Sequence, residues 1–172
     1  MATTTLERPP NKLQRSLERL DEAPRFMRKW VQGVILRRAV PFTATAGVRF
    51  ELLTPERVEV HLANEHKVQN HFGGVHASAM NLLAETATGL VLGMNVRDDA
   101  MPLAKEMRMA FRKRATGGLR AVATLTPEQR AAIEASDKGE ITVQVTVTDE
   151  AGIEPVECAF TWAWIPSGPR KN

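Results

Sequence analysis

Cysteine is nearly absent from this chain of 172 residues, tyrosine is absent, and no long apolar run occurs. Because the single cysteine, Cys158, excludes an internal disulfide, the composition is typical of a protein from a reducing compartment. No stretch of about 18 consecutive apolar residues is present, so we expect no membrane span. Residues 1–10 also lack the apolar core of a secretory signal peptide. The sequence therefore predicts a cytoplasmic protein.

The chain also has little net charge and few aromatic residues. Its 23 Lys and Arg residues exceed its 20 Asp and Glu residues by three, and only six Phe and three Trp are present. Nucleic-acid-binding domains usually carry a denser basic face with aromatic residues between the charges. We therefore expect no nucleic acid partner. The length fits one domain, which can bury roughly 68–70% of its unfolded surface without disulfides or metals.

The N-terminal part has a helical pattern. Residues 1–10 are predicted to be a disordered tail. Over residues 11–40, apolar residues recur at helical spacing, namely Leu13, Leu17, Leu20, Met27, Trp30, Val31, Val34 and Ile35. Arg37 and Arg38 follow this stripe, and a basic amphipathic helix can lie on a membrane surface. We favour instead a helix that packs on its own domain and exposes its basic face.

Residues 41–166 are predicted to form the main domain, with Pro41 ending the helical region. Alternating and β-branched runs predict six strands, at residues 45–53, 57–63, 101–114, 119–125, 140–148 and 155–165. Antiparallel strands with a helix on one face make an α+β fold.

Two helices interrupt the strands. The apolar segment over residues 75–96 is predicted to be a long helix. Thr126 and Gln129 form a capping-box pattern, which predicts a short helix over residues 127–136. Residues 167–172 are assigned to a C-terminal tail.

The long helix is apolar on nearly all sides, which predicts burial on most of them. Glu85 lies in its middle, and no Lys or Arg is present in the segment. A carboxylate among apolar residues costs several kcal/mol unless it has a partner. One face carries a narrow polar stripe, formed by Ser78, Asn81, Glu85 and Thr88. This stripe either holds a functional carboxylate or simply faces water or a subunit interface.

The segment before the helix, residues 70–76, is rich in glycine and leads directly into the helix N-terminus. Free N–H groups at such an end stabilise negative charge, including a developing oxyanion. Glu85, about two and a half turns downstream, could act as a nucleophile or as a general base. The glycines fit an ordinary loop equally well, so the pattern alone leaves both interpretations open.

The spacing Asn70-(x)5-His76-(x)8-Glu85 resembles the signature of hotdog-fold acyl-CoA thioesterases. It is most similar to the phenylacetate-pathway-like thioesterases and to a related hotdog branch of unknown function. The resemblance covers about residues 41–165. It implies an antiparallel sheet wrapped around a long central helix, here with extra N-terminal helices. It also implies a homodimer or a dimer of dimers, with the active site at the subunit interface.

The resemblance implies a role for each motif residue. Glu85 matches the catalytic carboxylate, and Asn70 matches the polar residue near the thioester or the lytic water. The N–H of Ala77 matches the oxyanion donor, and His76 is expected to support the loop and the helix start. Many relatives have Asp at the position of Glu85 and Gly-Gly at Ala77 and Ser78. Because glutamate is longer than aspartate, the sequence does not decide whether Glu85 acts as a nucleophile or as a general base. The methyl group of Ala77 is expected to narrow the substrate channel.

Further residues are candidates for substrate binding. Gly74, Ser78 and Asn81 lie beside the motif residues. Lys105, on the strand after the helix, could orient Glu85 or meet a phosphate, or it could simply face solvent. A basic cluster could bind the phosphates of CoA or could be solvated, and it comprises Arg112, Lys113, Arg114 and Arg120. CoA enters only as part of an acyl-CoA or acyl-carrier substrate, and no cofactor is expected.

Two other functions remain open. The pair His71 and Glu85 is similar to the His and Glu of hotdog 3-hydroxyacyl-thioester dehydratases, although the prolines typical of those enzymes are missing. A hotdog protein that binds acyl-CoA without turnover is the non-enzymatic alternative.

A metal site and a thiol nucleophile are not expected. Four histidines recur every five residues, a spacing that matches neither a helix face nor a strand face, at His61, His66, His71 and His76. Cys158 lies in an apolar strand and is interpreted as a buried structural thiol.

Overall fold

The computed structural model describes residues 9–21 and 25–167. It contains six strands, β1 (Arg49–Leu53), β2 (Arg57–Leu62), β3 (Ala100–Phe111), β4 (Leu119–Thr124), β5 (Gly139–Asp149) and β6 (Val156–Pro166). They form one antiparallel sheet in the order β1-β2-β4-β5-β6-β3. The helices are α1 (Lys12–Asp21), α2 (Arg25–Ala39), α3 (Pro41–Ala46), α4 (Ala77–Gly93) and α5 (Pro127–Ala135), with a short 3-10 helix, η1 (His66–Val68).

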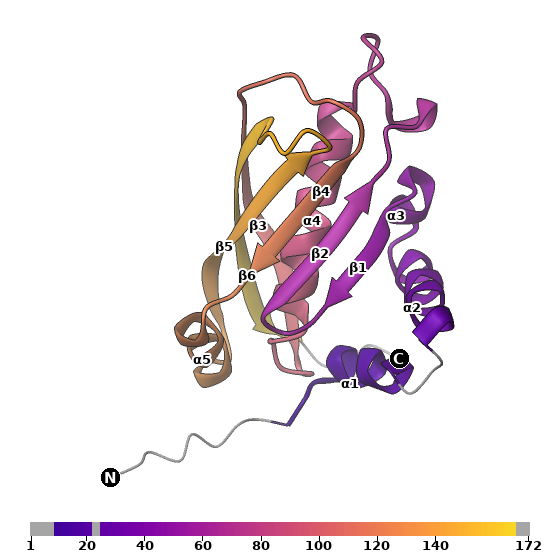
Figure 1. Ribbon diagram of the computed structural model, residues 1–172. Coiled ribbons are helices and arrows are strands. Elements are labelled where there is room, and N and C mark those ends of the chain that lie inside the picture. Colours follow the sequence, from indigo (N-terminus) through magenta and orange to yellow (C-terminus); the bar gives the residue numbers. More distant parts are fainter. Residues whose placement is uncertain (1–8, 22–24, 168–172) are drawn as a thin grey trace.

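The sheet curves around α4, and the N-terminal helices lie beside β1 (Figure 1). Helix α4 contacts β2, β3, β4, β5 and β6. This is the predicted hotdog fold, an α+β arrangement of a long helix inside an antiparallel sheet.

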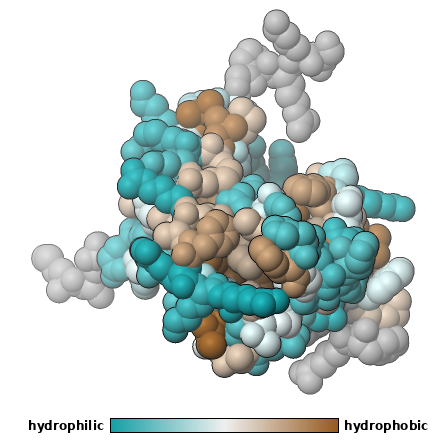
Figure 2. Space-filling model, turned by 90° about the horizontal axis from the view of Figure 1, so that it is seen from above, coloured by the Kyte–Doolittle hydropathy of each residue, from teal (hydrophilic) through white to brown (hydrophobic). Residues whose placement is uncertain are grey.

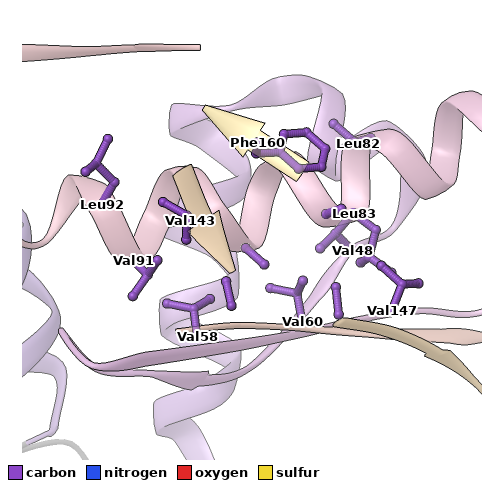
Figure 3. Close-up of a cluster of buried hydrophobic side chains, with 14 of the residues drawn as sticks. Val48, Val58, Val60, Leu82, Leu83, Val91, Leu92, Val143, Val147 and Phe160 are labelled. Atoms are coloured by element: carbon purple, nitrogen blue, oxygen red, sulfur yellow. The ribbon is translucent and has the colours of Figure 1, made fainter. Parts of the chain in front are cut away.

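The core lies between α4 and the sheet (Figure 3). Leu83 and Val91 of α4 meet Val58 and Val60 of β2, and all four are fully buried. A fully buried Val or Leu side chain contributes about 1.5–3 kcal/mol. The apolar residues of α4 therefore fix the rotation of the helix, and with it the direction in which its few polar residues point.

The prediction that Pro41 ends the helical region is wrong, because Pro41 starts α3. Proline is favoured in the first helical turn, where its missing N–H would have no partner anyway. Gly47, with a φ of 81°, ends the helix by donating its N–H to the carbonyl oxygens of Thr43 and Ala44. Strand β1 consequently begins at Arg49 rather than at residue 45.

The capping box of α5 is confirmed. The N–H of Gln129 donates to Thr126 Oγ1 at 3.2 Å, and the N–H of Thr126 donates to Gln129 Oε1 at 2.9 Å. The helix spans Pro127–Ala135, within the predicted range.

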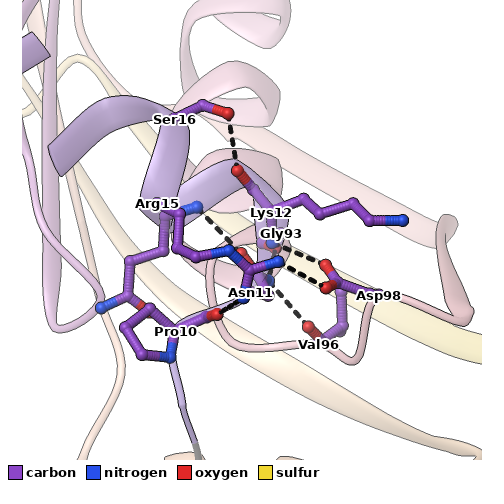
Figure 4. Close-up of polar contacts among 9 residues, drawn as sticks. Pro10, Asn11, Lys12, Arg15, Ser16, Gly93, Val96 and Asp98 are labelled. Carbon is purple, nitrogen blue, oxygen red and sulfur yellow. Dashed lines mark hydrogen bonds and ion pairs between the residues drawn. The ribbon is translucent and has the colours of Figure 1, made fainter. Parts of the chain in front are cut away.

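Helix α1 is tied to the far end of α4 through one side chain (Figure 4). Asn11 Nδ2 donates to the carbonyl oxygens of Gly93 and Val96, both at 2.7 Å. Arg15 adds an ion pair with Asp98 at 3.0 Å. These contacts join the predicted N-terminal helical segment to the main domain.

Helix α2 does pack on the domain, but largely with other residues than predicted. The side chains of Trp30 and Ile35 are exposed, whereas Gln32 and Leu36 are buried. Within the predicted tails, residues 1–8 and 168–172 lie outside the described residues.

Thr88, predicted to belong to the polar stripe of α4, is instead fully buried. Its hydroxyl accepts a hydrogen bond from Trp162 Nε1 at 3.0 Å and bonds to the carbonyl oxygen of Ala84 at 3.0 Å. The indole lies against Gly89, where an added Cβ would stand only 2.8 Å from Trp162 Cη2. The small residue at position 89 therefore permits close packing between α4 and β6.

We predict that Thr88→Val destabilises the domain by about 1–3 kcal/mol, because it leaves the buried Trp162 N–H without an acceptor. Thr86→Val is the matched control, since among the described residues the Thr86 hydroxyl bonds only to the Leu82 carbonyl of its own helix. Urea unfolding of both variants measures the difference. Equal stability of the two variants would contradict the prediction.

Candidate active site

The loop before α4 is shaped by Asn70. Its Oδ1 accepts hydrogen bonds from the N–H groups of Phe72 at 3.0 Å and Gly74 at 3.2 Å. Its backbone N–H donates to the carbonyl oxygen of Gly74 at 2.8 Å, and Gly73 takes a φ of 73° at the turn. Because Oδ1 is engaged by the loop, the Nδ2 amide is the part of the side chain left to contact a ligand.

The N-terminus of α4 is capped by His76, whose Nδ1 accepts a hydrogen bond from the N–H of Ser78 at 3.0 Å. His76 therefore supports the helix start. The neighbouring N–H of Ala77, the first residue of the helix, makes no hydrogen bond within the described ranges. It is a free donor at the positive end of the helix dipole.

A first cavity, here named the Asn70 cavity, lies at this end of α4 and has a volume of about 420 Å³. Asn70, Gly74 and Ala77 line it together with apolar and basic residues, namely Phe72, Val75, Met80, Phe111, Lys113, Arg114 and Ala115. Figure 2 views this end of the molecule, where apolar residues gather near the centre of the face and hydrophilic ones surround them. Five of the candidate residues, including Lys113 and Arg114, thus share one cavity.

Glu85 does not lie in that cavity. It lines a second one, here named the Glu85 cavity, with a volume of about 200 Å³ between α4, β1, β6 and the junction of α2 and α3. Ala77 and Glu85 are eight residues apart on α4, which corresponds to about 12 Å along the helix axis. Within one chain, the free N–H and the carboxylate therefore belong to two separate cavities.

The Glu85 carboxylate is half-buried, and burial raises its pKa above the ordinary value for a glutamate. None of the residues that the structure describes forms a hydrogen bond or an ion pair with it. A half-buried carboxylate without a partner has no evident structural role, and perturbed groups of this kind gather at functional sites.

Ser78 and Asn81 lie on the same stripe of α4 as Glu85, but neither lines a cavity with it. Ser78 is exposed in the first turn of the helix. Asn81 Nδ2 points to β3 and lies 3.6 Å from the sulfur of Met107.

The predicted basic residues separate into two groups. Lys105 is exposed and paired with Glu140, and Arg112 is paired with Glu157 at 2.8 Å, so within this chain neither meets Glu85. Arg114 lines the Asn70 cavity and donates to the carbonyl oxygen of Phe72 at 3.1 Å.

Several lining residues were not predicted from the sequence. Phe72 and Phe111, at the Asn70 cavity, are among the exposed large apolar residues. A phenylalanine directly before two glycines is a sequence signal that could have indicated Phe72. Leu36 and Val40 of the Glu85 cavity had no such signal, since their place depends on how α2 packs.

Cys158 is partly buried, and burial raises the pKa of its thiol to about 11. The thiol is therefore protonated near neutral pH, which argues against a nucleophilic role. In the part of the chain that the structure describes, no three His, Cys, Asp or Glu side chains gather as metal ligands. Over the same residues, no helix combines the length and apolar character needed to cross a membrane.

Solved structures share this fold. PA5026 of Pseudomonas aeruginosa, described as a protein of unknown function with a suggested thioesterase activity, is 27% identical with a TM-score of 0.70, over 76% of this chain and 90% of that one. The thioesterase HI1161 of Haemophilus influenzae is 15% identical with a TM-score of 0.62, over 76% and 87%. A variant of the thioesterase SAV0944 of Staphylococcus aureus is 19% identical with a TM-score of 0.64, over 74% and 100%. No curated protein sequence matches the chain.

The fold is thus that of the hotdog thioesterases, as the motif around Glu85 predicted. Residues 28–165 match the model of a family described as a domain of unknown function, DUF4442, and the chain belongs to that family.

We predict that Glu85→Gln raises the thermal midpoint at pH 7 by about 1–3 °C. At pH 7 the carboxylate is charged in the folded and the unfolded chain, so its burial costs folding free energy in full. Below the ordinary glutamate pKa it is neutral in both states and the cost disappears. The increase in the thermal midpoint caused by Glu85→Gln should therefore become smaller as the pH falls toward 4. Calorimetry across this pH range measures it.

Glu157→Gln is the control, because the pairing with Arg112 lowers the pKa of Glu157. Glu157→Gln should leave the thermal midpoint at pH 7 unchanged or lower it. A lower midpoint for Glu85→Gln at pH 7 would show that the carboxylate is stabilised by a partner.

Proposed function

We propose that the protein hydrolyses an acyl thioester of CoA to a carboxylate and free CoA, without a metal, using Glu85 as the catalytic carboxylate. The observation that carries the proposal is the half-buried Glu85 side chain without a partner in an apolar helix. The thioesterase names of similar structures support the same reaction class.

Two copies of the chain complete the proposed site. An oxyanion donor must lie about 2.7–3.1 Å from the reacting oxygen, and a reacting carboxylate or water about 3–3.5 Å from the carbonyl carbon. Ala77 and Glu85 of one chain are separated by about 12 Å along α4, too far for both to reach one thioester. We therefore place the Ala77 N–H and Asn70 of one subunit opposite Glu85 of the partner subunit.

The edge of the sheet supports this assembly. Strand β3 is the last strand of the sheet order, and within the described part of the chain only β6 pairs with it. Apolar side chains along it are exposed, namely Met101, Leu103, Met107 and Phe111. An unpaired edge with exposed apolar residues is a surface for pairing with another chain.

The chemistry then follows from the three groups. Glu85 either attacks the thioester carbon and forms an anhydride that water opens, or removes a proton from a water molecule that attacks directly. In both routes the Ala77 N–H stabilises the negative oxygen, and Asn70 Nδ2 positions the reacting group. The carbon–sulfur bond breaks, and the CoA thiolate leaves and takes up a proton.

The Asn70 cavity supplies a place for CoA. Lys113 and Arg114 line it, and neither forms an ion pair with a described residue. Unpaired basic side chains at a rim suit the CoA phosphates. The dehydratase alternative gains no support, because the His71 ring packs against Phe72 at 3.8 Å between centroids and lines neither cavity.

We predict that Glu85→Gln lowers thiol release from acetyl-, hexanoyl- and palmitoyl-CoA by about 10²–10⁴-fold, as expected for loss of a general base or nucleophile. Asn70→Asp, which keeps the loop acceptor but replaces the Nδ2 donor, should lower it by about tenfold or more. Release followed with a thiol reagent measures both, and light scattering reports the dimer.

Mixing the two variants tests whether the site is shared. A dimer of one Glu85→Gln chain and one Asn70→Asp chain, isolated with two different tags, has one intact site of two and should recover about half of wild-type turnover. No recovery would place both residues in one chain. Wild-type turnover in Glu85→Gln would remove Glu85 from the catalytic role. No turnover in the wild type would remove the proposed reaction and leave the non-catalytic binder.

We predict that Ala77→Pro lowers kcat by about 10²–10³-fold, the cost of one oxyanion donor. Proline is accepted at the first helical position and removes only the N–H. His76, at φ −66° and ψ 144°, already has the conformation preferred before proline. Ala77→Ser keeps the N–H and should keep turnover, with circular dichroism checking the helix. Normal turnover in Ala77→Pro would place the oxyanion donor elsewhere.

A further inference from the structure

The Glu85 cavity has walls from five elements, α2, α3, α4, β1 and β6. Glu85, Gly89 and Leu90 of α4 form its floor, with Trp162 of β6 on one side. The opposite side consists of the N-terminal helices and β1, with Leu36, Val40 and Phe50 among the lining residues. The N-terminal helices thus form part of the surroundings of the proposed catalytic carboxylate.

The lining of the Glu85 cavity suits an apolar occupant. Its two lining hydroxyls already have partners, since Thr43 Oγ1 donates to the Val40 carbonyl at 2.7 Å and Thr86 Oγ1 to the Leu82 carbonyl at 2.6 Å. Trp162 Nε1 donates to Thr88. Glu85 is the one ionisable side chain among the lining residues. The space beside the carboxylate therefore favours hydrocarbon.

The wall formed by the N-terminal helices is fixed in place. Leu36 is 5% exposed and belongs to the core of the domain. Helix α1, which contacts α2, is held by Asn11 at the end of α4. A wall held in this way limits the size of the occupant.

We propose that the Glu85 cavity receives the acyl chain of the substrate, and that Leu36 and Val40 limit it to groups of about six to eight carbons. The inference rests on the proposed function, because a thioester carbon held beside Glu85 leaves its acyl chain next to this cavity. The volume of about 200 Å³ sets the limit, since an apolar cavity of about 150 Å³ holds one benzene molecule.

Binding of non-hydrolysable thioethers tests the size limit separately from hydrolysis. S-hexyl-CoA should bind on the order of 100-fold more tightly than S-ethyl-CoA, because each buried methylene adds about fourfold. S-dodecyl-CoA should gain little beyond S-hexyl-CoA. Calorimetric titration of the wild-type dimer measures the three affinities.

Two variants locate the wall. Val40→Phe fills the cavity from an exposed position. It should reduce the advantage of S-hexyl-CoA over S-ethyl-CoA to less than about tenfold and leave the affinity for S-ethyl-CoA unchanged. Leu36→Ala enlarges the cavity and should let S-dodecyl-CoA bind about tenfold more tightly than S-hexyl-CoA. Ile35→Phe, on the exposed side of α2, is the matched control and should change none of the affinities.

The outcomes separate the two proposals. S-hexyl-CoA could bind more tightly than S-ethyl-CoA, with this difference lost in Val40→Phe, while no acyl-CoA releases thiol. That outcome would support the acyl subsite and contradict the proposed hydrolysis. Thiol release would support the hydrolysis in either case. If S-hexyl-CoA binds no more tightly than S-ethyl-CoA, or if Val40→Phe leaves the difference between them intact, the proposed subsite is wrong. Equal loss of S-ethyl- and S-hexyl-CoA binding in Val40→Phe, or no binding of any thioether, also overturns it.

Discussion

Helix α4 is enclosed by five strands of a single sheet, so its apolar side chains decide where every neighbouring strand lies. Turning the helix would expose residues such as Leu83 and Val91, which are now fully buried. The position of Glu85 follows from this constraint, because a carboxylate on a helix fixed by its apolar faces needs no partner to orient it. The fold thus holds the proposed catalytic carboxylate in place, and no described residue bonds to its oxygens.

The same helix also separates the chemical groups. Its N-terminus provides the free N–H of Ala77, whereas its middle provides the carboxylate and an apolar space. A rigid helix cannot bring these ends together within one chain. In the proposed dimer, association through β3 unites them, with the start of one helix opposite the middle of the other.

Much of the architecture could be predicted from the sequence, because alternation, the capping box at Thr126 and the motif around Glu85 are local signals. The errors have physical causes. Thr88 lies about 60° around the helix from Glu85, at the edge of the polar stripe, where β6 covers it. Pro41 after a helical pattern predicts the end of a helix, although proline can equally begin one.

The candidate site was harder to predict than the fold. The resemblance to the hotdog thioesterase motif groups Asn70, Ala77 and Glu85, but the sequence does not show which cavity each residue lines. That depends on the packing of α2 and α3 against α4, which has no local signal. The residues that form the wall, Leu36 and Val40, are ordinary aliphatic residues in the sequence.

The tether of Asn11 to Gly93 and Val96 has a consequence for synthesis of the chain on the ribosome. Its partners lie 82 and 85 residues further along. At about 5–20 residues per second, the N-terminal helices emerge about 4–16 s before their docking site exists. During that interval Leu17 and Leu36 cannot reach their final packing, so this segment is fixed in place only after the end of α4 has been made.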